Sequence, residues 1–219
     1  DANYVPTNSI SSGDSDNHYG YLSGNDSYPE VMIGRFSVEN SAHVNTMVQR
    51  TKMYELGLSN TGNWLNTSLG IASEQGPGDD NEMDYEHIRN MHADLQGYTY
   101  TSLLEMFDGS QGGNDAGGNP SSSMVSQAVN SGLGNILYTG HGSTYSWGSS
   151  GFSNSDIDQL SNTTAWPFIW SVACVNGNFV NNTSFAESWT RATNNGEPTG
   201  AIATLMSTIN QSWDPPMHA

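Results

Sequence analysis

Short, continuous apolar segments alternate with segments of helical periodicity along most of this chain, and this alternation limits the folds open to it. The segments that predict strands are residues 68–73, 98–107, 135–138, 167–173 and 201–206. Those that predict helices are residues 41–54, 84–95, 121–133 and 184–193. Continuous apolar strands separated by helices are typical of a parallel sheet that is covered on both faces. The sequence therefore predicts an α/β fold, with a mostly parallel sheet flanked by helices on both faces.

The first part of the chain lacks this alternation. Residues 1–29 are rich in Asn, Ser, Gly, Asp and Tyr, which predicts irregular chain on the surface. A short apolar run at residues 30–34 predicts a strand before the first helix. The chain shows no internal repeat and no low-complexity linker, and 219 residues suffice for one substantial core. We expect a single domain over residues 1–219.

The charge balance is strongly acidic, with 22 Asp and Glu against 5 Lys and Arg and a formal net charge of -17. Nucleic acid and anionic membrane surfaces are therefore not expected as partners, because both require basic surface. No apolar run approaches the roughly 20 residues that span a bilayer, so no membrane span is expected. An acidic surface suits basic ligands and Ca²⁺. A peptidase that cuts after basic residues would be protected from digesting itself by having few of them. Adaptation to a salty or cold medium explains the small number of Lys and Arg equally well.

Two reactive side chains follow consecutive predicted strands. His141 lies in Gly140-His141-Gly142 after one strand, and Cys174, the single cysteine, ends the next. Because sites in parallel α/β sheets form at the carboxyl ends of strands, we expect both side chains in one crevice. A thiolate and an imidazole are the minimum for nucleophilic acyl transfer, and the Gly142 and Cys174 N–H groups could stabilise an oxyanion. Either residue alone would more readily be structural; the pair favours catalysis. The remaining histidines show no zinc-ligand spacing and are expected to be structural.

Longer strings around the two residues narrow the hypothesis. Tyr-Thr-Gly-His-Gly-Ser at 138–143 and Pro-Phe-Ile-Trp-Ser-Val-Ala-Cys-Val-Asn-Gly-Asn-Phe at 167–179 resemble the catalytic region of gingipains, as do residues 198–200, 207–213, 25–36 and 49–55. The similarity covers roughly residues 18 to 219. It implies a caspase-like fold and a cysteine endopeptidase with a His/Cys dyad and no cofactor for catalysis.

The resemblance also implies roles for further residues. Glu74 falls where the family has an acidic residue that orients the histidine. Asp84 takes the place of a buried aspartate that selects Arg or Lys before the scissile bond, and Trp213 takes that of an aromatic pocket wall. Met217 is more similar to Arg-preferring than to Lys-preferring members. From the residues alone, the acidic stretch 79–84 is also compatible with a plain helix start or a Ca²⁺ loop. Family members carry structural Ca²⁺, so calcium is expected, although its ligands are not identified by the sequence.

Relative to the family, both ends of the chain look incomplete. Residues 1–60 resemble part of a first subdomain and residues 61–219 the catalytic subdomain. Since no secretory signal is present in the sequence, we expect a processed, extracellular form, with a second chain from proteolytic processing as one explanation of the missing parts. The leading hypothesis is cleavage after Arg, in preference to Lys, through a thioester acyl-enzyme. The alternatives are a catalytically silent, Ca²⁺-dependent binding module and a transpeptidase that uses the same dyad.

Overall fold

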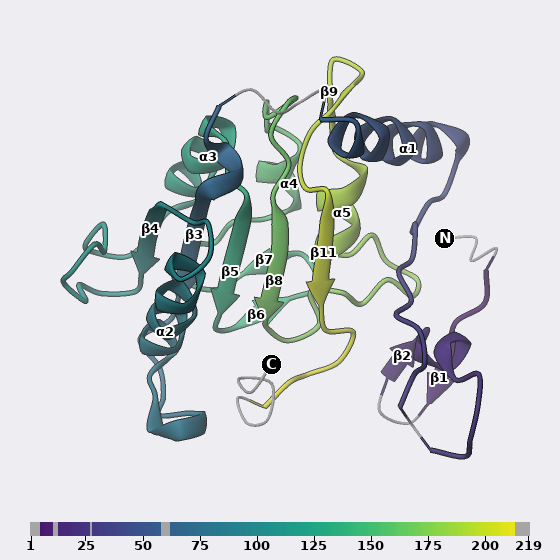
Figure 1. The fold of residues 1–219 in the computed structure, drawn as a ribbon, viewed down its shortest axis with the longest axis horizontal. Coiled ribbons are helices and arrows are strands. Elements are labelled where there is room, and N and C mark those ends of the chain that lie inside the picture. The colour runs from purple at the N-terminus through teal and green to yellow at the C-terminus, as the bar shows by residue number, and fades with distance from the viewer. Residues whose placement is uncertain (1–4, 11–12, 27, 58–61, 213–219) are drawn as a thin grey trace.

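The fold is centred on a parallel sheet. The computed structural model describes residues 5–10, 13–26, 28–57 and 62–212. Five strands form the sheet in the order β11-β8-β5-β3-β4, and every neighbouring pair is parallel (Figure 1). Their bounds are β3 Thr67–Ala72, β4 Ser102–Phe107, β5 Asn135–Thr139, β8 Phe168–Val172 and β11 Ala203–Met206. The predicted parallel α/β fold is confirmed.

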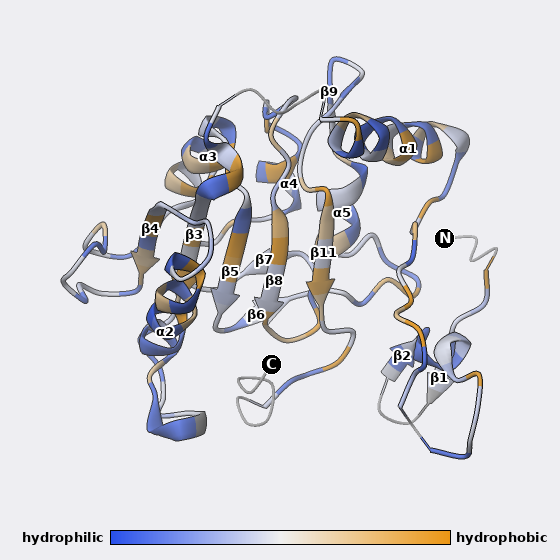
Figure 2. Ribbon diagram, in the orientation of Figure 1, coloured by the Kyte–Doolittle hydropathy of each residue, from blue (hydrophilic) through white to orange (hydrophobic). Residues whose placement is uncertain are grey.

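Helices cover both faces of this sheet. The helices concerned are α2 (Asp84–Gln96), α3 (Ser122–Ser131), α4 (Asn154–Ile157) and α5 (Phe185–Arg191). On one face, Leu69 and Ile136 belong to a buried cluster with side chains of α3, α4 and α5. On the opposite face, Ala72 and Leu137 pack with Ile88 of α2. Successive residues of β3 and β5 thus point to opposite faces and are buried on both, which explains their continuous apolar runs. Figure 2 shows orange over much of β5, β8 and β11.

The helix starts follow capping chemistry that the sequence contains. Helix α1 (Ser41–Glu55) begins after Asn40, whose Oδ1 accepts from the His43 N–H at 3.0 Å. Ser184 before α5 forms a reciprocal capping box with Glu187. None of the described helices is long and apolar enough to cross a membrane.

The chain before α1 holds a small hairpin and then an extended segment. Strands β1 (Asn8–Ile10) and β2 (Gly13–Ser15) pair antiparallel, and a 3-10 turn spans Asn17–Gly20. The strand predicted at residues 30–34 is wrong: no strand forms there, and Met32 is 94% exposed. The segment that follows is instead held by Arg191 of α5, which donates to the Ser37 carbonyl at 2.8 Å. The apolar side chains of residues 31–33 remain exposed, and no neighbouring strand covers them.

Several short elements lie outside the periodic pattern. They are the hairpins β6 (Gly142–Ser143) with β7 (Ser146–Trp147) and β9 (Thr193–Asn194) with β10 (Glu197–Pro198), and the 3-10 turns Trp64–Asn66 and Asp79–Asn81. The predicted strand 98–107 begins only at Ser102, because residues up to Tyr100 close the end of α2. The β6–β7 hairpin matters most, since it starts directly after His141.

Candidate active site

His141 and Cys174 lie at equivalent positions on adjacent strands. Thr139 of β5 pairs in register with Val172 of β8, and each reactive residue follows its paired residue by two positions. The Gly140 N–H still donates to the Val172 carbonyl at 3.2 Å, so the two chains remain side by side beyond the strands. Neighbouring strands are about 4.8 Å apart, and the carboxyl ends of parallel strands share one edge. The fold therefore places the two residues on neighbouring segments at the same edge of the sheet.

The backbone of His141 is fixed by Tyr138. The phenol hydroxyl of Tyr138 donates to the His141 carbonyl at 2.6 Å and accepts from the Gly148 and Ser149 N–H groups at 3.1 and 3.2 Å. The ring is fully buried and stacks on Trp147, with centroids 4.8 Å apart. Burial raises the pKa of Tyr138, so its hydroxyl remains a donor. Sequence reasoning missed this role, although Tyr138 stands inside the string that contains His141.

The imidazole of His141 contacts the loop that follows β3. Its Nε2 lies 3.0 Å from Oε1 of Gln75. Glu74, which the resemblance suggested as the orienting acid, is exposed. Its Oε2 lies beside Gly109, and a Cβ added at Gly109 would be 2.9 Å from this oxygen. The pKa of nearby Asp108 is raised, mainly by burial and in part by the Glu74 carboxylate. Gln75 is thus a contact of the candidate histidine that the sequence reasoning did not identify.

Cys174 lies under the segment that follows β11. Its Sγ is 3.5 Å from the Gln211 carbonyl oxygen and 3.4 Å from the Gln211 nitrogen. Next to it, Val175 donates to the Ile209 carbonyl at 2.9 Å. A small hollow is lined by Gly140, Val172, Ala173, Cys174, Gln211 and Ser212. Trp213 and Met217, the two expected pocket residues of this segment, lie outside the described residues.

A buried polar network joins the loop of Cys174 to the β6–β7 hairpin. Asn176 is fully buried, and its Nδ2 donates to the carbonyls of Ser143 and Ser146 at 2.6 and 3.1 Å. Ser171 of β8 donates to Asn176 Oδ1 at 3.1 Å and accepts from Trp147 Nε1 at 3.0 Å. These bonds fix the position of both segments that carry the expected oxyanion donors. Sequence reasoning missed Asn176, although it lies two residues after the cysteine.

The close packing of the same two segments explains a glycine beside the histidine. A Cβ at Gly142 would lie 2.8 Å from the Ala173 Cβ and 2.9 Å from Asn176 Nδ2. Only a glycine allows this approach without displacement. The N–H groups of Gly142 and Cys174 consequently belong to segments in direct contact.

Asp84, the expected specificity residue, is fully buried at the start of α2. The Ser73 hydroxyl donates to Asp84 Oδ2 and accepts from the Gln75 N–H at 3.1 Å. The Asp84 N–H donates to the Gln75 carbonyl at 2.9 Å. One loop therefore holds both the buried carboxylate and the residue in contact with His141.

A metal site is not apparent in the described parts of the chain, where no group of three or more His, Cys, Asp or Glu side chains could hold an ion. In the acidic stretch 79–84, Glu82 lies 3.0 Å from Nδ1 of His87 and accepts from Asn90 at 2.6 Å. Bound Ca²⁺ therefore stays a prediction without identified ligands.

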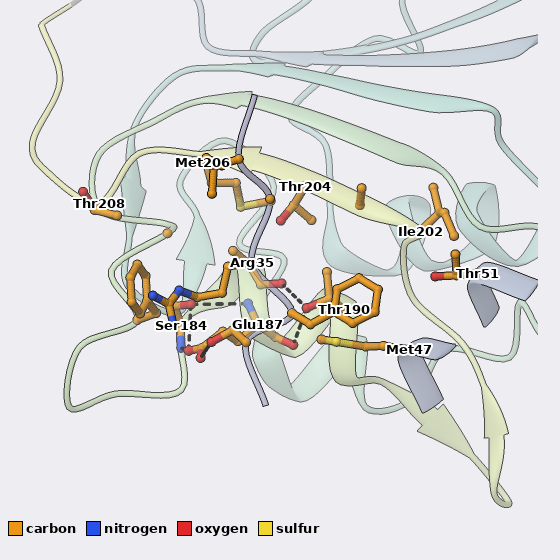
Figure 3. A pocket seen from close by; sticks show the side chains of 18 of the residues that line it. Arg35, Met47, Thr51, Ser184, Glu187, Thr190, Ile202, Thr204, Met206 and Thr208 are labelled. Carbon is orange, nitrogen blue, oxygen red and sulfur yellow. Dashed lines mark hydrogen bonds between the residues drawn. The ribbon is translucent and has the colours of Figure 1, made fainter. Parts of the chain in front are cut away.

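A further cavity lies away from these residues. About 360 Å³ in volume, it is bordered by β11, α5, α1 and the extended segment at 33–37 (Figure 3). Figure 3 shows Thr204 and Met206 on β11, Ile202 just before that strand, and Glu187 on α5. Buried Arg50 also lines it and donates to the carbonyls of Thr190 and Thr199. Neither His141 nor Cys174 borders this cavity, so its size gives no reason to place the chemistry there.

Comparison with known proteins agrees with the geometry. A sequence profile of peptidase family C25 matches residues 1–218. Gingipain R2 of Porphyromonas gingivalis is 42% identical over 207 residues, which are 93% of this chain and 27% of that protein. Gingipain R1 of the same organism is also 42% identical over 93% of this chain and 20% of its own length. The chain thus spans 27% and 20% of the length of these two relatives.

Solved structures show the same likeness. The crystal structure of the Arg-specific cysteine proteinase gingipain R is 38% identical with a TM-score of 0.89, covering 97% of this chain and 48% of that chain. A complex of the pro- and mature domains of RgpB from Porphyromonas gingivalis is 39% identical with a TM-score of 0.89, covering 97% of this chain and 49% of that chain. The resemblance seen in the sequence strings is confirmed, as is the caspase-like α/β fold. The chain belongs to peptidase family C25.

Proposed function

We propose that this protein is a cysteine endopeptidase that cleaves peptide bonds after basic residues, Arg in preference to Lys. The observation that carries the proposal is the equivalent placement of His141 and Cys174 beyond paired residues of β5 and β8. Membership of a cysteine peptidase family supports the same reaction class.

The proposed chemistry proceeds through a thioester. The Cys174 thiolate attacks the carbonyl carbon of the scissile bond, and the carbonyl oxygen gains negative charge. The N–H groups of Gly142 and Cys174 stabilise that oxyanion. His141 protonates the leaving amine and then takes a proton from the water that hydrolyses the thioester.

Asp84 is proposed to select the basic side chain. Its carboxylate is fully buried, so a cation that pairs with it would be strongly preferred over a neutral side chain. The preference for Arg over Lys is supported by the relatives, which are named gingipain R, and by the solved structure described as Arg-specific. Trp213 and Met217 remain proposed pocket residues.

The remaining expectations concern the whole protein. We propose an extracellular, secreted or surface-bound enzyme that acts on protein substrates and carries structural Ca²⁺. A second chain from processing is supported by the relative whose pro- and mature domains form a complex.

The test is a panel of fluorogenic peptides with Arg, Lys, Asp, Asn or Leu before the scissile bond. We expect cleavage of the Arg and Lys peptides that disappears in Cys174→Ala. Asp84→Asn should reduce kcat/KM for the Arg peptide on the order of 100-fold or more. Asp94→Asn on the exposed face of the same helix is the matched control and should leave the rate unchanged.

The same panel separates the alternatives. No Cys174-dependent cleavage of any peptide would favour a silent binding module. Products extended by an added amine, identified by mass spectrometry, would favour a transpeptidase. Cleavage after Asp or Asn alone would overturn the role proposed for Asp84.

A further inference from the structure

We propose that Gln75 is a positioning residue for His141 and that it fixes the tautomer of the imidazole. The inference rests on the proposed function, since it assigns a role within that same site. It starts from the 3.0 Å contact between Gln75 Oε1 and His141 Nε2. A carbonyl oxygen can only accept, so Nε2 carries the proton. In the neutral ring, Nδ1 is then the nitrogen that carries no proton.

The position of Gln75 is itself fixed through its backbone. Its N–H donates to the Ser73 hydroxyl at 3.1 Å, and its carbonyl accepts from the Asp84 N–H at 2.9 Å. Ser73 in turn donates its own N–H to the Thr139 carbonyl at 3.1 Å, two residues before His141. The amide side chain therefore projects from an anchored loop, which limits the entropy lost when it orients the ring.

The amide differs from a carboxylate in one chemical respect. Both accept a hydrogen bond from Nε2, but only a carboxylate adds a negative charge that stabilises the imidazolium. Gln75 thus orients the ring without adding a negative charge beside it. Glu74, one residue earlier, is the competing candidate, and its carboxylate lies beside Gly109.

The inference can be tested by removing and by charging the acceptor. Gln75→Met retains the length of the side chain without its acceptor, and we expect kcat to fall about tenfold or more with KM little changed. Gln75→Glu restores an acceptor, so kcat should recover to within about threefold of the unmodified enzyme. The charge added in Gln75→Glu should shift the alkaline limb of the pH profile of kcat/KM to higher pH, by about one unit. Gln127→Met, at an exposed position of α3, is the matched control.

Two activity results would overturn the inference. One is a kcat for Gln75→Met equal to that of the unmodified enzyme. The other is an unchanged alkaline limb in Gln75→Glu. A loss of kcat in Glu74→Gln combined with none in Gln75→Met would assign the positioning role to Glu74.

A spectroscopic readout separates this inference from the proposed function. Long-range ¹H–¹⁵N correlation spectra of histidine-labelled protein report the tautomer directly, and the signals missing in His141→Ala identify the ring. We expect a higher fraction of the Nε2–H tautomer in the unmodified protein than in Gln75→Met, where only the intrinsic preference of the ring for that tautomer remains. An equal fraction in both proteins would overturn the inference even if the peptidase activity is established. If no peptide is cleaved but the tautomer changes as expected, the proposed function fails while the positioning contact stands.

Discussion

The hydroxyl of Tyr138 donates a hydrogen bond of 2.6 Å to the carbonyl oxygen of His141, three residues later in the chain. The same oxygen of Tyr138 accepts from the backbone of Gly148 and Ser149. One buried hydroxyl therefore closes the loop between β5 and the end of the β6–β7 hairpin. The placement of the candidate catalytic histidine depends on this side chain as well as on the strand that carries it.

Tyr138→Phe should reduce both stability and turnover. The substitution leaves the Ser149 N–H without this partner and removes one of two hydrogen bonds at the Gly148 N–H and at the His141 carbonyl, which still pair with each other at 2.8 Å. In this half-buried place the loss costs about 1–3 kcal/mol. We expect a lower Tm and a fall in kcat of about tenfold, because the His141 backbone is less constrained. Thermal unfolding and steady-state kinetics on the Arg peptide measure the two effects. Tyr145→Phe, which removes a hydroxyl bonded to Asn182 at an exposed site, is the control and should change neither by much. Equal behaviour of the two variants would contradict the anchoring role of Tyr138.

Ser73→Ala should weaken the discrimination between basic and neutral substrates. The Ser73 hydroxyl donates to the buried Asp84 carboxylate, and its loss leaves that group less well oriented. A hydrogen bond to a charged group contributes about 1.5–3 kcal/mol, so we expect kcat/KM for the Arg peptide to fall roughly tenfold or more. The rate for a Leu peptide should change less. If both substrates lose rate by the same factor, Ser73 supports the fold and not the selectivity.

Gly142→Ala should disturb the junction between the hairpin and the loop of Cys174. The added methyl would meet the Ala173 Cβ at 2.8 Å, and neither group can rotate away. We expect a loss of about 1–3 kcal/mol in the free energy of unfolding and a fall in kcat on the order of tenfold or more. Gly34→Ala is the control, because a Cβ there would meet nothing within 4 Å. A Gly142→Ala enzyme with normal kcat would argue against an oxyanion donor at this position.

His92 should make the fold sensitive to mild acid. The ring is 2% exposed between α2 and β3, its Nε2 lies 3.1 Å from the Ser68 hydroxyl, and its Nδ1 has no partner. Burial lowers the pKa of His92 from 6.5 to about 4. Between these values the unfolded chain binds the proton and the folded chain does not, so stability falls as the pH drops from about 6.5 to about 4. The loss contributed by this group is on the order of 3 kcal/mol, complete near and below pH 4.

The measurement is chemical denaturation of the unmodified protein and of His92→Gln across pH 4 to 8. The variant cannot titrate, although its amide can still bond to Ser68. We expect it to be somewhat less stable at pH 8 and to lose less stability on acidification. Parallel curves for the two proteins over that range would contradict a buried neutral His92.

The centre of the sheet could be predicted because β3 and β5 are buried on both faces. Leu69 faces one layer of helices and Gly70 the other, so the apolar run has no polar interruption and is recognisable without a partner strand. The same reasoning failed at residues 30–34, where Val31 and Met32 are exposed and no neighbouring strand pairs with them. An apolar run predicts burial only when another element is available to cover it.

The candidate site was predictable in part for a similar reason. His141 and Cys174 follow strands, and strand ends can be located from the sequence. Gln75 and Asn176 act through contacts with residues far away in the chain, at separations of 66 and 33 positions. No local pattern encodes such contacts. The roles of Glu74 and Asp84 came from the resemblance to gingipains and remain predictions.

The proposed function requires Cys174, activated by His141, to attack peptides whose residue before the scissile bond is basic. The rate at which a peptidyl-arginine acyloxymethyl ketone forms a thioether with the purified protein measures this reaction directly, followed by intact mass and located by peptide mapping. We predict stoichiometric labelling of Cys174, at least 100-fold faster than with the matching leucine reagent, and slowed by His141→Ala. Absence of labelling, or equal rates with the arginine and leucine reagents, would overturn the proposed function.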